Sequence, residues 1–393
     1  MFKKQHIANI IFIIILLYIV SPWFFEKKLL FNELISLIGI SILFYKKFKI
    51  EKSLITKWFL CILLLGILHS LTSVFRADKI YYYLRNSVIL YSMFSFFIGY
   101  YLYNYGITFL SKFRSLLNIY IITFLFYPIS TFFFERFSMS NFFPSIAKIF
   151  NRKLILPILI LLNIVYSINY ESATTMLLSG IYFFIWICPS YKFFKNIFLI
   201  AFFTAAVFFA IAIPFITINP SHYSYYNTIA IYEVINSHPI LALDPNSTWR
   251  LVIWKQLIVD LFPNNIIGIG FGTPALKYFP IEDIKKLDTL PYVLGGHNSF
   301  IYLFARLGIL FIVFITLIYN NIFKEYFNYK KYYFHNYSIL IFYSFLAVTF
   351  IALFNPVLES PIYSSSYWLI LGFLAKVISL RQKQQSSSQI ENN

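Results

Sequence analysis

His297 and Arg250 are the residues of this chain whose types and positions best fit acid–base and anion-binding chemistry. His297 directly precedes an apolar run, so we expect it at the N-terminus of a helix, where the helix dipole disfavours the imidazolium form. A neutral imidazole can accept a proton from an attacking hydroxyl group. The alternative is structural, because polar residues at helix starts commonly cap the helix.

Arg250 belongs to residues 244–263, which are predicted to form one helix closed by Pro263. Arg250 and Trp254 are four residues apart and therefore share a face of this helix. A guanidinium group suits a diphosphate because its planar fork donates parallel hydrogen bonds. The structural alternative is a cation–π contact between Arg250 and a neighbouring tryptophan.

Further polar residues are expected on the same side of the molecule. Arg306 lies nine residues into the helix after His297, about 13 Å deep at roughly 1.5 Å per residue, and a charge at that depth normally faces a wet cavity or a partner. Glu359 lies between the last two apolar runs, where it is solvated or pairs with an arginine. Three alternating glycines in 266–272 allow tight turns or close backbone approach, but lack the spacing of a dinucleotide-binding loop.

No metal site is predicted from the sequence. The remaining histidines lack metal-ligand spacing, and no Asp-x-Asp pair occurs in the chain. Cys61 and Cys188 lie in separate apolar runs, so they are expected to be buried thiols rather than a disulfide. These observations favour a reaction that needs neither a metal nor a cofactor.

The composition excludes a soluble enzyme, a secreted disulfide scaffold and a disordered chain. Of 393 residues, 60% are hydrophobic and only 12% are charged, whereas a soluble protein is about 45–50% apolar and about 25% charged. Apolar runs of roughly 20 residues, long enough to cross a bilayer core, recur along the chain. The net charge of +17 fits the basic cytoplasmic loops of membrane proteins better than nucleic-acid binding. We therefore predict an all-α polytopic membrane protein.

We predict about twelve transmembrane helices, with one large outer (periplasmic) loop that contains short helices. The stretch 129–147 must span or re-enter the membrane for the basic loops to fall on one side, although Glu135 and Arg136 make it a poor span. The apolar runs are 7–25, 29–45, 57–75, 82–105, 113–128, 153–170, 172–189, 195–218, 298–320, 335–354 and 361–379.

The predicted organisation has four parts. Residues 1–218 form a transmembrane bundle of about nine helices, and 297–380 form the last three. Residues 219–296 between them carry a net charge of −1, which leaves +18 on the rest of the chain, so this nearly neutral segment is expected on the outer side. Residues 381–393 are predicted to be a disordered cytoplasmic tail.

The order of the motifs resembles the O-antigen ligase and O-antigen polymerase superfamily of bacterial surface-polysaccharide enzymes. About twelve spans, with the large outer loop before the last three, match the topology of that family. The run Asn-Pro…Glu…Pro at 355–361 also resembles its last outer turn. The sharper motifs follow one another between Ser247 and Gly308, as Arg250 with Trp254, Pro263, Gly268-Ile-Gly270, His297-Asn298 and Gly308.

The resemblance implies a glycosyltransferase in the bacterial inner (plasma) membrane, with its active site facing the periplasm. Its donor would be an undecaprenyl-diphosphate-linked oligosaccharide and its acceptor a glycan, within the lipid bilayer, and a chain-length regulator protein is a further candidate partner. His297 and Arg250 then become catalytic residues. The residues assigned to substrate binding are Trp254, Asn298, Arg306 and Glu359.

We favour a polymerase of O-antigen or capsule repeat units. The alternative is an O-antigen ligase that transfers the polymer to lipid A–core, and a lipid-linked glycan transporter or flippase is a remote alternative. One departure from the family concerns the helices upstream of the loop, where a Ser-Arg pair is often present. Residues 170–176 keep Ser172 but have no arginine, so another cation serves there or the donor is held differently.

Overall fold

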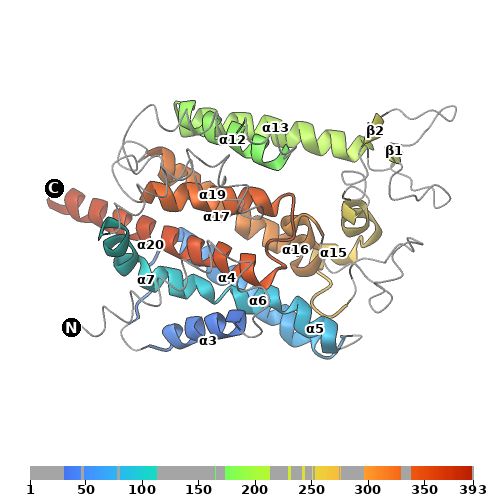
Figure 1. Ribbon diagram of the computed structural model, residues 1–393, viewed down its shortest axis with the longest axis horizontal. Helices are drawn as coiled ribbons and strands as arrows, with labels where there is room; N and C mark the ends of the chain where they lie inside the picture. Colours follow the sequence, from blue (N-terminus) through green and yellow to red (C-terminus); the bar gives the residue numbers. More distant parts are fainter. Residues whose placement is uncertain are drawn as a thin grey trace, which may run out of the picture.

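The computed structural model describes residues 31–45, 48–77, 80–112, 164, 173–212, 229–231, 241–243, 250, 253–273, 275, 296–328 and 338–391. Within these ranges the chain is helical apart from one short pair of strands (Figure 1). The helices are α3 (Phe31–Leu43), α4 (Leu54–Ser73), α5 (Ile80–Asn86), α6 (Val88–Ser92), α7 (Ser95–Lys112), α12 (Ala173–Ile187), α13 (Tyr191–Ala212), α15 (Asn264–Ile267), α16 (Ser299–Leu307), α17 (Ile309–Asn328), α19 (Ser338–Ala352) and α20 (Pro361–Glu391).

Three of the described helices are long and apolar enough to cross a membrane: α4, α17 and the part of α20 from Tyr363 to Lys383. On α4 the exposed side chains Leu60, Leu64, Leu68 and Leu71 recur every three or four residues, so they form one apolar face suited to lipid. The helical architecture agrees with the predicted all-α membrane class. The predicted span 7–25 and the stretch 129–147 lie outside the described residues, so the number of spans stays a prediction.

Helices α7 and α20 cross at close range because small residues line their contact. A Cβ atom at Gly99 would lie 2.0 Å from the carbonyl oxygen of Leu369, and one at Gly372 would meet the backbone of α7 equally closely. Just before α7, the hydroxyl groups of Ser92 and Ser364 lie 2.6 Å apart. Small residues and interhelical hydroxyl contacts of this kind hold helices together in lipid, where apolar burial gives little drive.

The apolar run 82–105 is not one uninterrupted helix, because it is divided among α5, α6 and α7. The breaks fall at serines whose side chains bind nearby backbone carbonyls. Ser87 Oγ donates to the carbonyl oxygen of Tyr83 at 2.7 Å, and Ser95 Oγ donates to that of Ser92 at 2.7 Å. Such local hydrogen bonds compete with regular helix geometry, and hydropathy alone does not reveal them.

The predicted span 298–320 is also interrupted, because α16 ends at Leu307 and α17 begins at Ile309. Gly308 between them has φ 81°, which glycine adopts without the steric cost that other residues incur. Residue Arg306 therefore lies at the C-terminal end of a short helix. It still lies nine residues after His297 in the helix that follows, as predicted, but that helix ends directly beyond it.

The predicted tail 381–393 is helical through Glu391, because α20 continues well beyond its apolar part. The amide of Gln382 donates to Glu325 Oε1 of α17 at 3.0 Å. Lys, Arg and Gln have high helix propensity, so a polar sequence at the end of an apolar helix can extend it. Disorder was predicted from the polarity of this stretch, without regard to the helix propensity of its residues.

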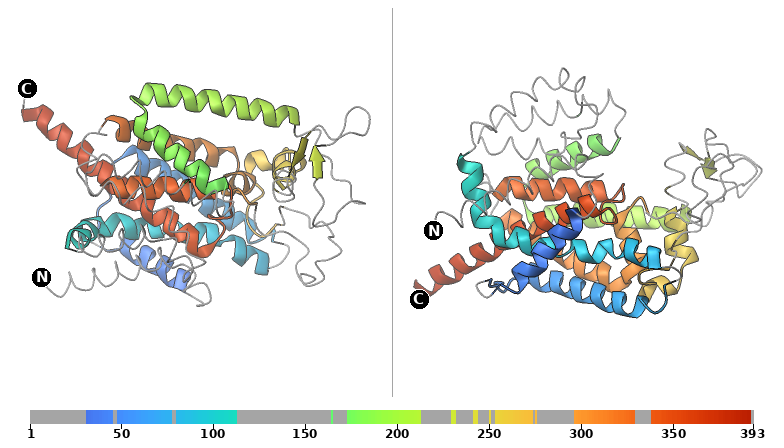
Figure 2. Two further views of the ribbon diagram at one scale, coloured as in Figure 1. Left: turned by 45° about the horizontal axis from the view of Figure 1, so that its top comes forward. Right: turned by 60° about the horizontal axis from the view of Figure 1, so that its bottom comes forward.

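The segment 219–296 contains a feature that the sequence did not predict. Strands β1 (Ile229–Ile231) and β2 (Leu241–Leu243) pair antiparallel, with Ile229 opposite Leu243. Figures 1 and 2 show them at the same end of the molecule as α15 and α16. The predicted short helices are present as well, in α15 and in a π-helical turn from Gln256 to Asp260.

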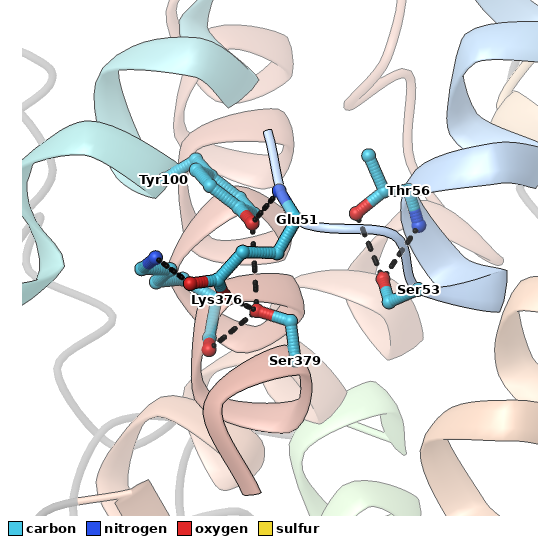
Figure 3. Close-up of polar contacts among 6 residues, drawn as sticks. All are labelled: Glu51, Ser53, Thr56, Tyr100, Lys376 and Ser379. Atoms are coloured by element: carbon cyan, nitrogen blue, oxygen red, sulfur yellow. Dashed lines mark hydrogen bonds and ion pairs between the residues drawn. The ribbon is translucent and has the colours of Figure 1, made fainter. Parts of the chain in front are cut away.

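The opposite end of the molecule, here called the Glu51 end, is held by a polar cluster between α7, α20 and the chain before α4 (Figure 3). Glu51 Oε1 lies 3.1 Å from Lys376 Nζ, and Ser379 Oγ donates to Glu51 Oε2 at 2.8 Å. The backbone N–H of Glu51 donates to Tyr100 Oη at 2.9 Å. The end that contains α15, α16 and the α19–α20 turn is called the α16 end.

Basic residues that the charge pattern assigned to the inner side gather at the Glu51 end of the described chain. They lie before α4, at the start of α13 and at the ends of α17 and α20: Lys49, Lys52, Lys192, Lys195, Lys324, Arg381 and Lys383. The α16 end is then the expected outer end. Figure 1 shows the two ends at opposite extremes of the helical bundle.

Candidate active site

The glycine-rich segment 268–272 forms a tight turn against α16. Gly268, Gly270 and Gly272 have φ values of 105°, 73° and 85°, and this left-handed region favours glycine. The backbone N–H groups of Ile269 and Gly270 donate to the last carbonyls of α16 at 2.9 Å each. The alternating glycines were expected to allow tight turns or close backbone approach, and the structure contains both.

Gly308 packs against the same turn. A Cβ atom added at Gly308 would lie 2.3 Å from the carbonyl oxygen of Ile267, and one at Gly268 would lie 2.6 Å from that of Arg306. The two glycines therefore let α15 and the C-terminus of α16 approach at backbone distance. Although Gly268 and Gly308 are 40 positions apart in the chain, both serve the same backbone contact.

Arg306 fixes this contact from the inside. Its side chain is only 2% exposed, and its Nη1 atom donates to the carbonyl oxygens of Gly270, at 3.0 Å, and of Thr273. Its Nη2 atom donates to Tyr302 Oη at 2.8 Å, and Tyr302 Oη donates in turn to Asn86 Oδ1 at 3.1 Å. In the structure Arg306 thus satisfies buried carbonyls of the glycine turn, which supports a positioning function rather than direct substrate binding.

Asn298 begins α16 as its N-cap. Its side-chain oxygen accepts hydrogen bonds from the backbone N–H groups of Phe300, at 3.0 Å, and Ile301, at 3.1 Å. Asn298 is 8% exposed. Capping fixes the direction in which the preceding residue enters the helix, so the placement of Asn298 supports orientation of His297.

His297 stands at this entry with a left-handed backbone, φ 48°. Residues other than glycine rarely adopt this region, and such strain is commonly found at functional sites. Its side chain is half-buried. Burial and the nearby Arg250 charge both lower the pKa of His297 below its usual range. The lowered pKa agrees with the expected neutral imidazole, with burial and the Arg250 charge as its causes in place of the helix dipole.

Arg250 and Trp254 both act on the turn that carries His297. Trp254 Nε1 donates to the carbonyl oxygen of Gly296 at 3.1 Å, and the Arg250 charge acts on the imidazole. The predicted shared face of these two residues therefore points toward His297. The side chain of Asn265 donates to the carbonyls of Leu257 and Ile258 at 2.9 and 2.8 Å, which closes the helix that carries Trp254, near the predicted position.

Glu359 reaches the same turn from between α19 and α20. Its Oε2 atom forms a short hydrogen bond with Ser299 Oγ, and Ser299 is fully buried. Burial raises the pKa of Glu359 to about 7. Hydrogen bonds from Ser299 and from backbone N–H groups, together with the charge of Arg306, lower the pKa but do not outweigh burial. Glu359 was expected to be solvated or to pair with an arginine; its carboxyl group is buried against Ser299 and also feels the charge of Arg306, and its assignment to substrate binding stays a prediction.

The structure brings all six predicted site residues to the α16 end: Arg250, Trp254, His297, Asn298, Arg306 and Glu359. Ser172 lies outside the described residues, whereas residues 173–176 of the stretch expected to match the upstream family arginine begin α12. Sequence reasoning missed Ser299, Tyr302 and Asn86. The available signal for Ser299 was its place directly after His297-Asn298, and Asn86, 216 residues from Tyr302, gave no signal.

No three His, Cys, Asp or Glu side chains among the described residues are grouped so that they could hold a metal ion. The chemistry of the site therefore has to be argued from the imidazole, guanidinium and carboxyl groups present. A neutral imidazole beside a guanidinium can remove a proton while the guanidinium stabilises a developing anion. A reaction without a metal stays a prediction.

Comparison with known proteins gives one match, and it contains most of this site. Residues 156–316 match the family model described as O-antigen ligase. No curated protein and no solved structure matches the chain. The matched range runs into α17 and includes Arg250, Trp254, the glycine turn, His297 and Arg306, while Glu359 lies beyond it. Over this range the chain is similar to the O-antigen ligase family, and the order of motifs inside the range agrees with that similarity.

Proposed function

We propose that the protein is a membrane glycosyltransferase that polymerises undecaprenyl-diphosphate-linked oligosaccharide repeat units at the outer face of the bacterial inner membrane. The family match supports glycan transfer from a lipid-linked donor. The apolar helices α4, α17 and α20 suit a donor whose lipid tail stays in the bilayer. The gathering of site residues at the end opposite the basic residues supports an outward-facing site.

The observation that carries the proposal is the environment of His297. Its pKa is lowered by burial and by Arg250, so it is neutral and basic near neutral pH. Trp254 and Asn298 hold the residues on either side of it. A base fixed in this way can reach a substrate hydroxyl repeatedly in one geometry, which lowers the barrier to proton transfer.

The reaction proceeds by displacement at the anomeric carbon of the donor sugar. The acceptor hydroxyl forms the new glycosidic C–O bond while the bond between the anomeric carbon and the diphosphate breaks. The hydroxyl proton passes to His297, and the leaving lipid diphosphate keeps the bonding electron pair. Arg250 stabilises the negative charge that develops on the diphosphate oxygens, so the two residues act on opposite sides of the transferred sugar.

The first test replaces His297 by alanine in cells that lack the chromosomal copy. We expect long-chain glycan to disappear while the protein stays in the membrane, because removal of a general base costs about 10²–10⁴-fold in rate. The matched control is His222→Ala, in the 219–296 segment that precedes His297. Polymer at the wild-type level in the His297→Ala strain would refute the proposal.

The glycan pattern in the same strain separates a polymerase from a ligase. A single repeat unit on the acceptor indicates a lost polymerase. No repeat unit on the acceptor, together with polymer that accumulates on the lipid carrier, indicates a lost ligase that transfers to lipid A–core. Translocation of lipid-linked oligosaccharide without any glycan product would instead favour a transporter.

A further inference from the structure

The chain segment from Trp254 to the glycine turn is fastened to α16 at both ends. At the start of α16, Trp254 Nε1 donates to the carbonyl oxygen that precedes His297. At the end of α16, two backbone N–H groups of the glycine turn donate to the last carbonyl oxygens of the helix at 2.9 Å each. Helix α15 packs on α16 between these two attachments. Arg250 lies four residues before Trp254, so its placement relative to His297 depends on both attachments.

Arg306 is the side chain that secures the attachment at the end of α16. Its Nη1 atom donates to the carbonyl oxygens of Gly270, at 3.0 Å, and of Thr273. Its Nη2 atom donates to Tyr302 Oη at 2.8 Å, and its Cζ atom lies 4.9 Å from the centre of the same ring. A planar guanidinium group fixes the directions of all its hydrogen bonds together. The glycine turn therefore cannot shift along α16 without breaking one of them.

The groups that Arg306 joins are themselves held by the ends of two other helices. The backbone N–H of Phe271, in the glycine turn, donates to Ser73 Oγ at 2.8 Å, at the last residue of α4. Tyr302 Oη donates to Asn86 Oδ1 at 3.1 Å, at the last residue of α5. Both Ser73 and Asn86 are buried. Arg306 thus connects a turn that α4 holds to a tyrosine that α5 holds.

The use of a buried charge at this joint favours a need for fixed geometry. Arg306 is 2% exposed, and no carboxylate among the described residues forms an ion pair with it. Its Nε atom is buried and has no hydrogen-bond partner in the described part of the chain. The desolvation cost of a buried charge commonly cancels its contribution to stability, whereas a guanidinium fork holds its partners in one defined arrangement.

We propose that Arg306 is a positioning residue of the transfer reaction, which locks the glycine turn to α16 and thereby sets the distance between the Arg250 guanidinium and the His297 imidazole. This inference rests on the proposed function, in which these two groups act on the diphosphate and on the acceptor hydroxyl. Because they act on opposite sides of one sugar, their separation has to match the substrate. An error of about 1 Å in such a separation costs about 10²-fold in rate.

The pH dependence of turnover reports this distance. His297 must be neutral to accept a proton, so the rate rises with pH through the pKa of His297, which gives the profile an acid limb. The charged groups around His297 are Arg250, Glu359 from the α19–α20 turn and Arg306 at the far end of α16. Of these, Arg250 lowers the pKa of His297. If Arg250 moves away from His297, this pKa rises and the acid limb moves to higher pH.

The experiment measures turnover across the pH range, and thermal unfolding, of the full-length protein in liposomes. The probe is undecaprenyl-diphosphate oligosaccharide extracted from a strain that lacks this gene. Tyr302→Phe is the decisive variant, because it removes the hydroxyl group between Arg306 and Asn86 without changing any charge. We expect its kcat to fall about 3- to 10-fold, the scale of one lost hydrogen bond, and its acid limb to move to higher pH.

Tyr100→Phe is the matched control. Tyr100 and Tyr302 are each 1% exposed, and the hydroxyl group of each forms hydrogen bonds, but Tyr100 lies at the Glu51 end. The two variants should therefore lose similar thermal stability. We expect Tyr100→Phe to keep the kcat and the acid limb of the wild type, so that a change confined to Tyr302→Phe reports position and not stability.

Variants of Arg306 itself should show larger effects. In Arg306→Met we expect kcat to fall about 10²-fold, while KM changes less than about threefold. Arg306→Lys keeps the charge but not the fork, so its kcat should lie between those of Tyr302→Phe and Arg306→Met; it carries the test if Arg306→Met fails to fold. The double variant Arg306→Met/Tyr302→Phe should lose no more than Arg306→Met alone, because the two side chains form one network.

Four results would overturn the inference. Wild-type kcat in Arg306→Lys or Arg306→Met would remove the positioning function. An acid limb that stays in place in Tyr302→Phe would mean that Arg250 has not moved. Equal loss of kcat in Tyr100→Phe and Tyr302→Phe would reduce the effect to stability. A raised KM in Arg306→Met, with wild-type behaviour of Tyr302→Phe, would assign Arg306 to substrate binding.

His297→Ala in the same assay separates this inference from the proposed function. An active His297→Ala enzyme refutes the proposed function itself. An inactive one, together with any of the four contrary results, refutes the positioning function of Arg306 and leaves His297 as the base.

Discussion

Glu359 lies just before the start of α20, whereas Glu51 contacts the middle of that helix at Lys376 and Ser379, and the two carboxyl groups meet different surroundings. Glu51 pairs with Lys376 and accepts from Ser379, so both of its oxygens have donors. Burial raises the pKa of Glu51, but these hydrogen bonds and the Lys376 charge outweigh it and leave the pKa below its ordinary value. Glu359 meets Ser299, backbone N–H groups and the charge of Arg306, but burial outweighs them and raises its pKa.

The difference separates a structural carboxyl group from one that can change state during function. The Glu51 cluster is a matched pair whose charges do not change near neutral pH, so it fastens α20 to α7 and the chain before α4. The α16 end combines a strained histidine, a carboxyl group that titrates near neutrality and a buried arginine. Groups with shifted pKa values gather at functional sites, which favours the α16 end as the catalytic one.

The largest effect is expected from Arg250, which acts on His297 at the α16 end. Arg250→Ala should lower kcat about 10²–10³-fold, as the loss of a charge-stabilising donor does. It should also move the acid limb to higher pH, because the Arg250 charge lowers the pKa of His297.

Arg250→Lys sharpens this prediction, because lysine keeps the charge but not the planar fork. We expect the acid limb to stay in place while kcat still falls. The measurement is the pH–rate profile of the three enzymes in liposomes. A fall in kcat for Arg250→Ala with no movement of the acid limb would break the link between Arg250 and His297.

A smaller effect is expected from the glycine contact that supports the site. Gly308→Ala forces a residue with a Cβ atom into φ 81°, at a cost of about 1–2 kcal/mol, and places that atom 2.3 Å from the Ile267 carbonyl oxygen. We expect lower thermal stability and reduced kcat. The control is Gly180→Ala on α12, where a Cβ atom meets nothing within 4 Å. Equal behaviour of the two variants in thermal unfolding would contradict this account.

The smallest effect is expected at the Glu51 end. Glu51→Gln removes a partly exposed ion pair, worth at most about 1 kcal/mol, and should leave kcat unchanged. Because the pKa of Glu51 in the folded protein lies below its ordinary value of 4.5, its stabilising contribution is present above that pH and is lost as pH falls below it. Thermal unfolding of wild type and Glu51→Gln should therefore differ at neutral pH and converge in acid. A difference in thermal stability between wild type and Glu51→Gln that grew in acid would contradict a stabilising ion pair at Glu51.

Sequence patterns predicted the residues of the site better than the elements that hold them. Helical spacing was enough to place Arg250 beside Trp254, and the order of motifs shared with the resembled family related both to His297-Asn298. Gly308 was recognised as part of a motif, but its effect, a break between α16 and α17, follows from a contact with Ile267. Ser87 and Ser95 broke an apolar stretch through hydrogen bonds to the backbone, which composition does not encode.

The function of Glu359 was the hardest to predict, because its partner is distant in the chain. Ser299 and Glu359 are 60 residues apart, and no periodicity relates them. The sequence indicated only a carboxyl group on the same side as the arginines. Whether a group at such a position binds substrate or supports a catalytic turn depends on which side chain it meets after folding.

The most direct test of the catalytic assignment measures release of undecaprenyl diphosphate by purified protein in liposomes. The enzymes compared are the wild type, His297→Ala and Glu51→Gln, one change at each end of the molecule. The account predicts that His297→Ala releases lipid diphosphate at least about 10²-fold more slowly than the wild type, while Glu51→Gln matches it. Release by His297→Ala at the wild-type rate would contradict the assignment of the α16 end as the active site.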